Sequence, residues 1–220
     1  MKKLNKKGFT LIELLAVIII LGVLMIIAIP AVTKYINDSR KSAYVDSAVH
    51  YSDAVMKEAI AGKDLKMYET DALYLIAVGH KKDESCVTLE SGGKSPYSDD
   101  WNYAYVGVTY SENGYSYYFI SEDGSGQGLP MLTNKDLVDE GTEHFYSSNS
   151  DEGATAAALA TAIKGKYALN ANYIATSEED LTTFAALKTF AQTKSGNTIT
   201  KIIFINKPAS GNCHYEKANS

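Results

Sequence analysis

Gly8-Phe9-Thr10-Leu11-Ile12-Glu13-Leu14-Leu15 begins a 24-residue stretch, Phe9–Val32, in which Glu13 is the only charged residue. At about 1.5 Å rise per residue a helix over this stretch would be about 36 Å long, enough to cross the hydrocarbon core of a membrane. Four lysines precede the stretch and the remainder of the chain is acidic, with an overall net charge of −5. This distribution predicts a membrane helix with its basic end in the cytoplasm and its acidic body outside.

Two ordinary explanations of this segment leave Glu13 unexplained. A secretory signal peptide has a shorter apolar core of roughly 7–15 residues and a small-residue cleavage site, and Ala28-Ile29-Pro30-Ala31 fits that site poorly. A plain membrane anchor accounts for the length and the lysines. An ionised carboxylate on a lipid-facing helix costs several kcal/mol, however, so Glu13 is expected to have a partner or a task.

The segment Gly8–Leu15 resembles the processing motif of type IV pilins and related pseudopilins, most closely that of the type IVa branch. The resemblance implies that prepilin peptidase cleaves between Gly8 and Phe9 and that the new amino terminus of Phe9 is N-methylated. It implies that Glu13, one helical turn after Phe9, pairs with the Phe9 amino terminus of a neighbouring subunit during assembly. Pro30 would kink the helix or open it locally, as prolines at this distance do in pilins.

The same resemblance names the partners that we expect. They are prepilin peptidase, other copies of the chain, minor pilins, the pilus assembly platform and ATPase in the membrane, and membrane lipid before assembly. The expected location is the cell membrane, as a single-pass protein, and then an extracellular pilus at the cell surface. No cofactor is expected, and the acidic body lacks the basic face that nucleic-acid binding requires.

Apolar residues continue beyond Val32 at helical spacing. The steps of four, three, four and four residues predict one buried helix face, formed by Tyr44, Ala48, Tyr51, Val55 and Ala59. Gly62 is positioned to cap this helix. We therefore expect a leader at residues 1–8, a transmembrane and filament-core helix at 9–32, its amphipathic continuation at 33–62, and an extracellular head at 63–220.

The head is expected to be α+β, with the long N-terminal helix packed against an antiparallel sheet and further helices in the C-terminal region. Strands are predicted at 103–110 and 115–120, joined through Asn113-Gly114, with a candidate third strand at 198–205. A short strand is predicted at Cys86–Leu89. Helices are predicted near Thr70–Val78, at Ala154–Ile163, and at Glu178–Thr193 after a Ser177 cap. Residues 120–198 match no family motif.

No catalytic or metal-binding motif of the usual spacing occurs, so we expect neither enzyme activity nor a metal site. The acidic turns Asp99-Asp100 and Glu122-Asp123-Gly124 have too few ligands for a calcium loop and are predicted to be solvated. Seven of the sixteen tyrosines lie between Tyr97 and Tyr118, as suits a half-exposed sheet. Cys86 and Cys213 could form a disulfide if the head is extracellular, or remain free thiols.

The leading hypothesis is a type IV pilus subunit that supports adhesion, aggregation or motility. The alternatives are a pseudopilin of a type II secretion or competence machine, and a minor tip pilin that binds a ligand. The N-terminal motif is common to all three and does not separate them.

Overall fold

The computed structural model describes residues 9–61, 65–79, 85–87, 89, 94–147 and 149–215. The chain divides into two compact units, Met1–Arg40 and Lys41–Ser220, and the long helix α1, Leu11–Ala61, contributes to both. The predicted cap Gly62 lies outside the described residues. All five residues of the predicted buried face are buried, which confirms the amphipathic pattern of this part of α1.

Within the described part of the second unit, seven strands form one sheet in the order β5-β4-β3-β2-β1-β7-β6. Their bounds are β1 Ala72–Ala77, β2 Trp101–Ser111, β3 Gly114–Asp123, β4 Gln127–Thr133, β5 Tyr146–Ser147, β6 Tyr173–Ala175 and β7 Lys201–Ile205. The helices that follow α1 are α2 Asn134–Glu140, α3 Asp151–Tyr167, α4 Glu178–Thr183 and α5 Ala185–Ser195. The predicted α+β class is confirmed, although β1 and β7 pair in parallel rather than antiparallel.

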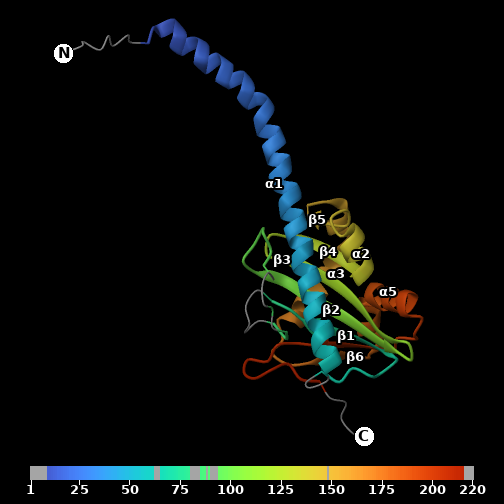
Figure 1. The fold of residues 1–220 in the computed structure, drawn as a ribbon. Helices are drawn as coiled ribbons and strands as arrows, with labels where there is room; N and C mark the ends of the chain where they lie inside the picture. Colours follow the sequence, from blue (N-terminus) through green and yellow to red (C-terminus); the bar gives the residue numbers. More distant parts are fainter. Residues whose placement is uncertain are drawn as a thin grey trace, which may run out of the picture. The chain divides into compact units, whose positions relative to one another are not determined.

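Both faces of the sheet are covered, each by different helices. On one face the C-terminal half of α1 packs against side chains such as Tyr74, Val106 and Ile203. On the other face α3 and α5 pack against side chains such as Leu75 and Phe204. Figure 1 shows this half of α1 crossing the strands. The second layer of helices comes from residues 120–198 and was not predicted to cover the sheet.

The predicted helix near Thr70–Val78 is wrong, because this segment forms strand β1. All six residues of β1 are buried, with Leu73 and Leu75 facing one core and Tyr74 and Ile76 facing the other. A strand covered on both faces has no alternation of apolar and polar residues, so its sequence resembles that of a buried helix.

The predicted hairpin is present, with β2 and β3 paired from Trp101–Asp123 to Ser111–Gly114. Gly114 has a φ of +111°, a conformation that favours glycine, whereas the φ of Asn113 is not positive. Cys86 and Val87 form a bend instead of the predicted strand, and Thr88 lies outside the described residues.

The predicted C-terminal elements are found with shifted boundaries. The expected helix at Ala154–Ile163 lies within α3, and the strand expected at 198–205 is shorter, as β7. The expected helix at Glu178–Thr193 is two helices that meet at Phe184. The Phe184 side chain is buried in the core between the sheet and the helices α3 and α5. The Ser177 cap is confirmed, because its side chain accepts a hydrogen bond from the Asp180 amide.

Candidate assembly site

The first turn of α1 closes on itself through Thr10 and Glu13. Glu13 Oε2 accepts hydrogen bonds from the Thr10 amide and the Thr10 hydroxyl, both at 2.8 Å, while Thr10 Oγ1 lies 3.3 Å from the Glu13 amide. This reciprocal arrangement is a capping box, which satisfies amides that the first turn of a helix leaves without partners. The carboxylate also lies at the positive end of the helix dipole.

Sequence reasoning identified Glu13 but missed Thr10. The signal was present, because a threonine followed three residues later by a glutamate is the capping-box pattern that was applied to Ser177. Within the described residues Glu13 Oε1 makes no hydrogen bond, so one carboxylate oxygen remains available to a group from outside the chain.

Phe9 and Pro30 are the other predicted site residues of this segment that the structure describes. Phe9 is the first described residue, precedes the helix, and is 84% exposed. Gly8, the other half of the expected cleavage site, lies outside the described residues. Pro30 lies inside α1, which continues through it without a break, and Thr33 Oγ1 donates to the Ile29 carbonyl at 2.9 Å.

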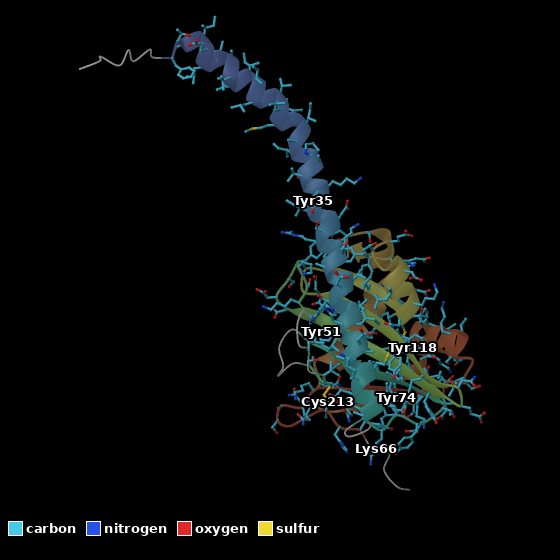
Figure 2. All side chains as sticks on the ribbon, in the orientation of Figure 1. Tyr35, Tyr51, Lys66, Tyr74, Tyr118 and Cys213 are labelled. Atoms are coloured by element: carbon cyan, nitrogen blue, oxygen red, sulfur yellow. A yellow bond between two sulfur atoms is a disulfide. The ribbon has the colours of Figure 1, made fainter. Side chains whose placement is uncertain are left out.

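The apolar side chains of the first unit project outward from the helix, as Figure 2 shows. Among the described residues α1 is the one helix long and apolar enough to cross a membrane. None of the residues in its most apolar 18-residue segment is buried. Exposed apolar surface of this extent is rare in soluble monomers and marks a region that contacts a membrane or other protein chains.

In the head, the two cysteines form a disulfide between Cys86 and Cys213, with their Cα atoms 5.1 Å apart (Figure 2). The bond joins the segment after β1 to the segment after β7, across a sequence separation of 127 residues.

The acidic turn that includes Asp123 is not solvated as predicted. Asp123 is fully buried, and its Oδ1 accepts hydrogen bonds from the amides of Ser125 at 2.9 Å and Gln127 at 3.0 Å. Its other oxygen accepts from the Ser95 hydroxyl. Within the described residues no group of three or more His, Cys, Asp or Glu side chains is placed to hold a metal ion.

A hydroxyl network next to Asp123 joins α1 to the sheet. The Tyr44 hydroxyl lies 2.9 Å from Ser121 Oγ and donates to the Gln127 carbonyl at 3.2 Å. Burial raises the pKa of Tyr44 well above its usual range, so its hydroxyl keeps its proton at any physiological pH. Through these contacts with Ser121 and Gln127, which flank the acidic turn, Tyr44 fixes the amphipathic half of α1 on the sheet.

The capping box at Thr10 and Glu13, the apolar helix that follows it and the α+β head define a class of protein with a membrane-compatible N-terminal helix. The prokaryotic N-terminal methylation motif matches residues 3–29. The type IV wide pilus major component PilA4 of Thermus thermophilus is 37% identical over 88 residues, which cover 39% of this chain and 63% of the relative. Fimbrial protein Q of Moraxella bovis is 42% identical over 62 residues, which cover 28% of this chain and 40% of the relative. The chain is therefore similar, in its N-terminal part, to type IV pilus and fimbrial proteins, and it carries their N-terminal methylation motif.

The matches span less than two thirds of the length of either relative. No solved structure matches the chain significantly.

Proposed function

We propose that this chain is a structural subunit of a type IV pilus, made as a precursor and polymerised through its N-terminal helix. In this proposal prepilin peptidase removes residues 1–8, and the new Phe9 terminus is N-methylated. The subunit waits in the membrane as a single-pass protein before it joins an extracellular filament that supports adhesion, aggregation or motility. Its relatives are named as pilus and fimbrial components, which supports a structural rather than a catalytic role.

The observation that carries the proposal is that the Glu13 carboxylate accepts two hydrogen bonds from Thr10 at the start of α1, whose apolar first part has no buried residue. In a membrane, the two hydrogen bonds from Thr10 lower the cost of keeping this carboxylate away from water. In a filament, Glu13 Oε1 would accept a charge-assisted hydrogen bond from the Phe9 amino terminus of a neighbouring subunit. That contact would neutralise both charges and set the position of each arriving subunit.

The partners follow from this mechanism. Residues 9–32 would contact lipid before assembly and other copies or minor pilins afterwards, so that protein replaces lipid around the same apolar surface. A membrane assembly platform and its ATPase would supply the work of extraction. The acidic head is not proposed to bind nucleic acid.

Mass spectrometry of surface material tests the processing step. The expected N-terminal peptide begins at N-methylated Phe9, and Met1 retained in assembled filaments would refute the proposal.

Assembly is tested with Glu13→Ala and Glu13→Gln. Both variants should be cleaved and inserted normally, because the cleavage site is unchanged. Neither should form filaments at more than a few per cent of the wild-type amount, because neither supplies a charge for the neighbouring amino terminus. A matched control is Asp38→Ala, which changes a carboxylate outside the apolar stretch and should assemble normally. Normal filaments from Glu13→Gln would show that the charge of Glu13 plays no part.

Immunogold microscopy distinguishes the proposal from the two alternatives within the family. A pilus subunit should be labelled along the length of extended fibres. Label at fibre tips alone would indicate a minor tip pilin, and label confined to the envelope would indicate a pseudopilin of a secretion or competence machine.

A further inference from the structure

A cavity of about 400 Å³ lies on the outer face of the sheet, in the layer formed by residues 120–198. Its walls include Tyr103, Ile120 and Met131 from the sheet and Leu187 from α5, none of which is more than 7% exposed. Pro130, Glu143 and His144 also line the cavity and are exposed. The cavity is therefore a deep apolar recess with a polar rim, and its volume lies in the range of small-molecule sites.

The two phenol hydroxyls of the recess, those of Tyr103 and Tyr146, are already hydrogen-bonded. The Tyr103 and Tyr146 hydroxyls lie 3.2 Å apart, and Tyr146 donates to Glu122 Oε2 at 3.5 Å. The other oxygen of Glu122 accepts from Asn102 at 2.8 Å, and the Asn102 carbonyl oxygen accepts from Lys164 at 2.8 Å.

The direction of each hydrogen bond in this series is fixed at one end, because the Lys164 ammonium can only donate. The Asn102 amide therefore accepts from Lys164 and donates to Glu122, and Glu122 also accepts a hydrogen bond from the Tyr146 hydroxyl. Burial raises the pKa of Tyr146 to about 12 and that of Tyr103 further, so both phenols are neutral at physiological pH.

Water would be poorly held in such a recess. A volume of about 400 Å³ corresponds to roughly a dozen molecules of liquid water, and each retained water needs two to four polar partners. The Tyr103 and Tyr146 hydroxyls are already hydrogen-bonded, so most of these waters would face apolar walls. Displacing these waters with an apolar molecule is favourable. The bound molecule would also make van der Waals contacts with the apolar walls.

We propose that this recess binds a small, uncharged, largely apolar aromatic molecule. Its class follows from the neutral hydroxyls of Tyr103 and Tyr146, the aromatic walls that these two residues form with Phe190, and the absence of Lys and Arg among the described lining residues. A carboxylate-bearing analogue is disfavoured, because Glu143 lies at the rim and the floor offers it no counter-charge. This binding activity is separate from filament assembly through α1.

The test uses indole as the probe and the full chain in detergent micelles, with ¹³C-labelled methionine methyl groups. Three of the five methionines report on different places. Met131 lines the recess, Met67 is buried in the core under α1, and Met25 lies in the apolar part of α1. Met25 therefore reports how indole partitions into the micelle, and Met67 reports whether the fold is intact.

Indole should shift the Met131 methyl signal along a saturable curve and give nuclear Overhauser effects to that methyl, while Met67 stays unchanged. Indole-3-acetate, which adds a carboxylate, should bind at least tenfold more weakly. Ala186→Phe places a ring at the recess from an exposed position of α5 and should weaken indole binding at least tenfold. Ala185→Phe is the matched control, since Ala185 is exposed on the same helix and does not line the recess, and binding should change less than twofold.

Three results would overturn the proposal. The first is a Met131 shift that does not saturate and follows that of Met25, because it would show partitioning into the micelle alone. The second is unchanged indole binding in Ala186→Phe with a normal Met67 signal. The third is a pair of results: wild-type protein binds no indole, and the Ala186→Phe variant forms no filaments. Together they would show that the recess holds a neighbouring subunit instead of a small molecule.

Discussion

Removing the Cys86–Cys213 disulfide should cost the head a large part of its stability. The bond closes a segment of 127 residues, and the chain-entropy relation gives a stabilisation of about 5 kcal/mol at 25 °C for a loop of that length. This is the lower end of the total unfolding free energy of an ordinary domain. For a unit the size of Lys41–Ser220 we expect the melting temperature to fall by about 10–20 °C.

The change to make is the double variant Cys86→Ala/Cys213→Ala, which avoids leaving one reactive thiol. Guanidinium unfolding is followed by the fluorescence of Trp101, the only tryptophan, which lies in the head and is partly buried. Wild-type protein with reductant provides a second route to the same unlinked state. Both should lose about 5 kcal/mol and agree within about 1 kcal/mol, and both should unfold with a steeper denaturant dependence because the unlinked chain exposes more surface.

A loss below about 2 kcal/mol in both experiments would refute the reasoning, because it would mean that the unfolded chain gains little freedom when the link is cut. Labelling of both thiols in denatured, unreduced wild-type protein would refute it more directly, because no link would then exist.

Three smaller predictions use the same fluorescence titration. Asp123→Ala should cost about 3 kcal/mol or more, because the amides of Ser125 and Gln127 and the buried Ser95 hydroxyl all lose their acceptor; a loss below about 1 kcal/mol would mean that water replaces the carboxylate. Gly128→Ala should cost about 1–3 kcal/mol, since its new methyl group would lie 2.5 Å from a tyrosine ring, whereas Gly165→Ala, in an open helical site, should be neutral or stabilising. The Thr200 hydroxyl donates to Asp71 and lowers its pKa, so this stabilisation is present above about pH 4 and is lost as the pH falls through the lower folded pKa. Asp71→Asn should therefore lose less stability than wild type between pH 6 and pH 2, and equal losses would contradict the assignment.

The elements that were predictable from sequence are those whose pattern is local. The buried face of α1 follows from residue spacing alone, and the β2–β3 hairpin follows from two strand-forming runs joined by a short polar turn. The Ser177 cap was found because its partner is three residues away. In each case the interaction that decides the structure lies within a few residues of the pattern.

Two strands were missed for different reasons, one because its partner lies far along the chain and the other because a proline interrupts its pattern. β1 pairs in parallel with β7, so Leu73 lies opposite Ile202, and this pairing buries a run whose sequence fits a helix equally well. β4 was missed because Pro130 interrupts its pattern, and the structure accommodates this residue where the pairing of β3 with β4 shifts its register. The pairing of β1 with β7 is not indicated by residues near β1 itself, because about 120 residues separate the two strands.

The candidate site was partly predictable for a physical reason. If a peptidase cleaves the chain between Gly8 and Phe9, it must recognise a short linear segment, whatever the head does. The cap of Glu13 is likewise formed by Thr10, three residues away, so the same eight-residue stretch carries both signals. The recess on the outer face of the sheet is the opposite case. It is assembled from side chains as distant in sequence as Tyr103 and Phe190, and it exists only after β2, β4 and α5 have been brought together. Sequence patterns therefore describe how this subunit is expected to be processed and joined to others, while any ligand specificity of its head depends on long-range packing.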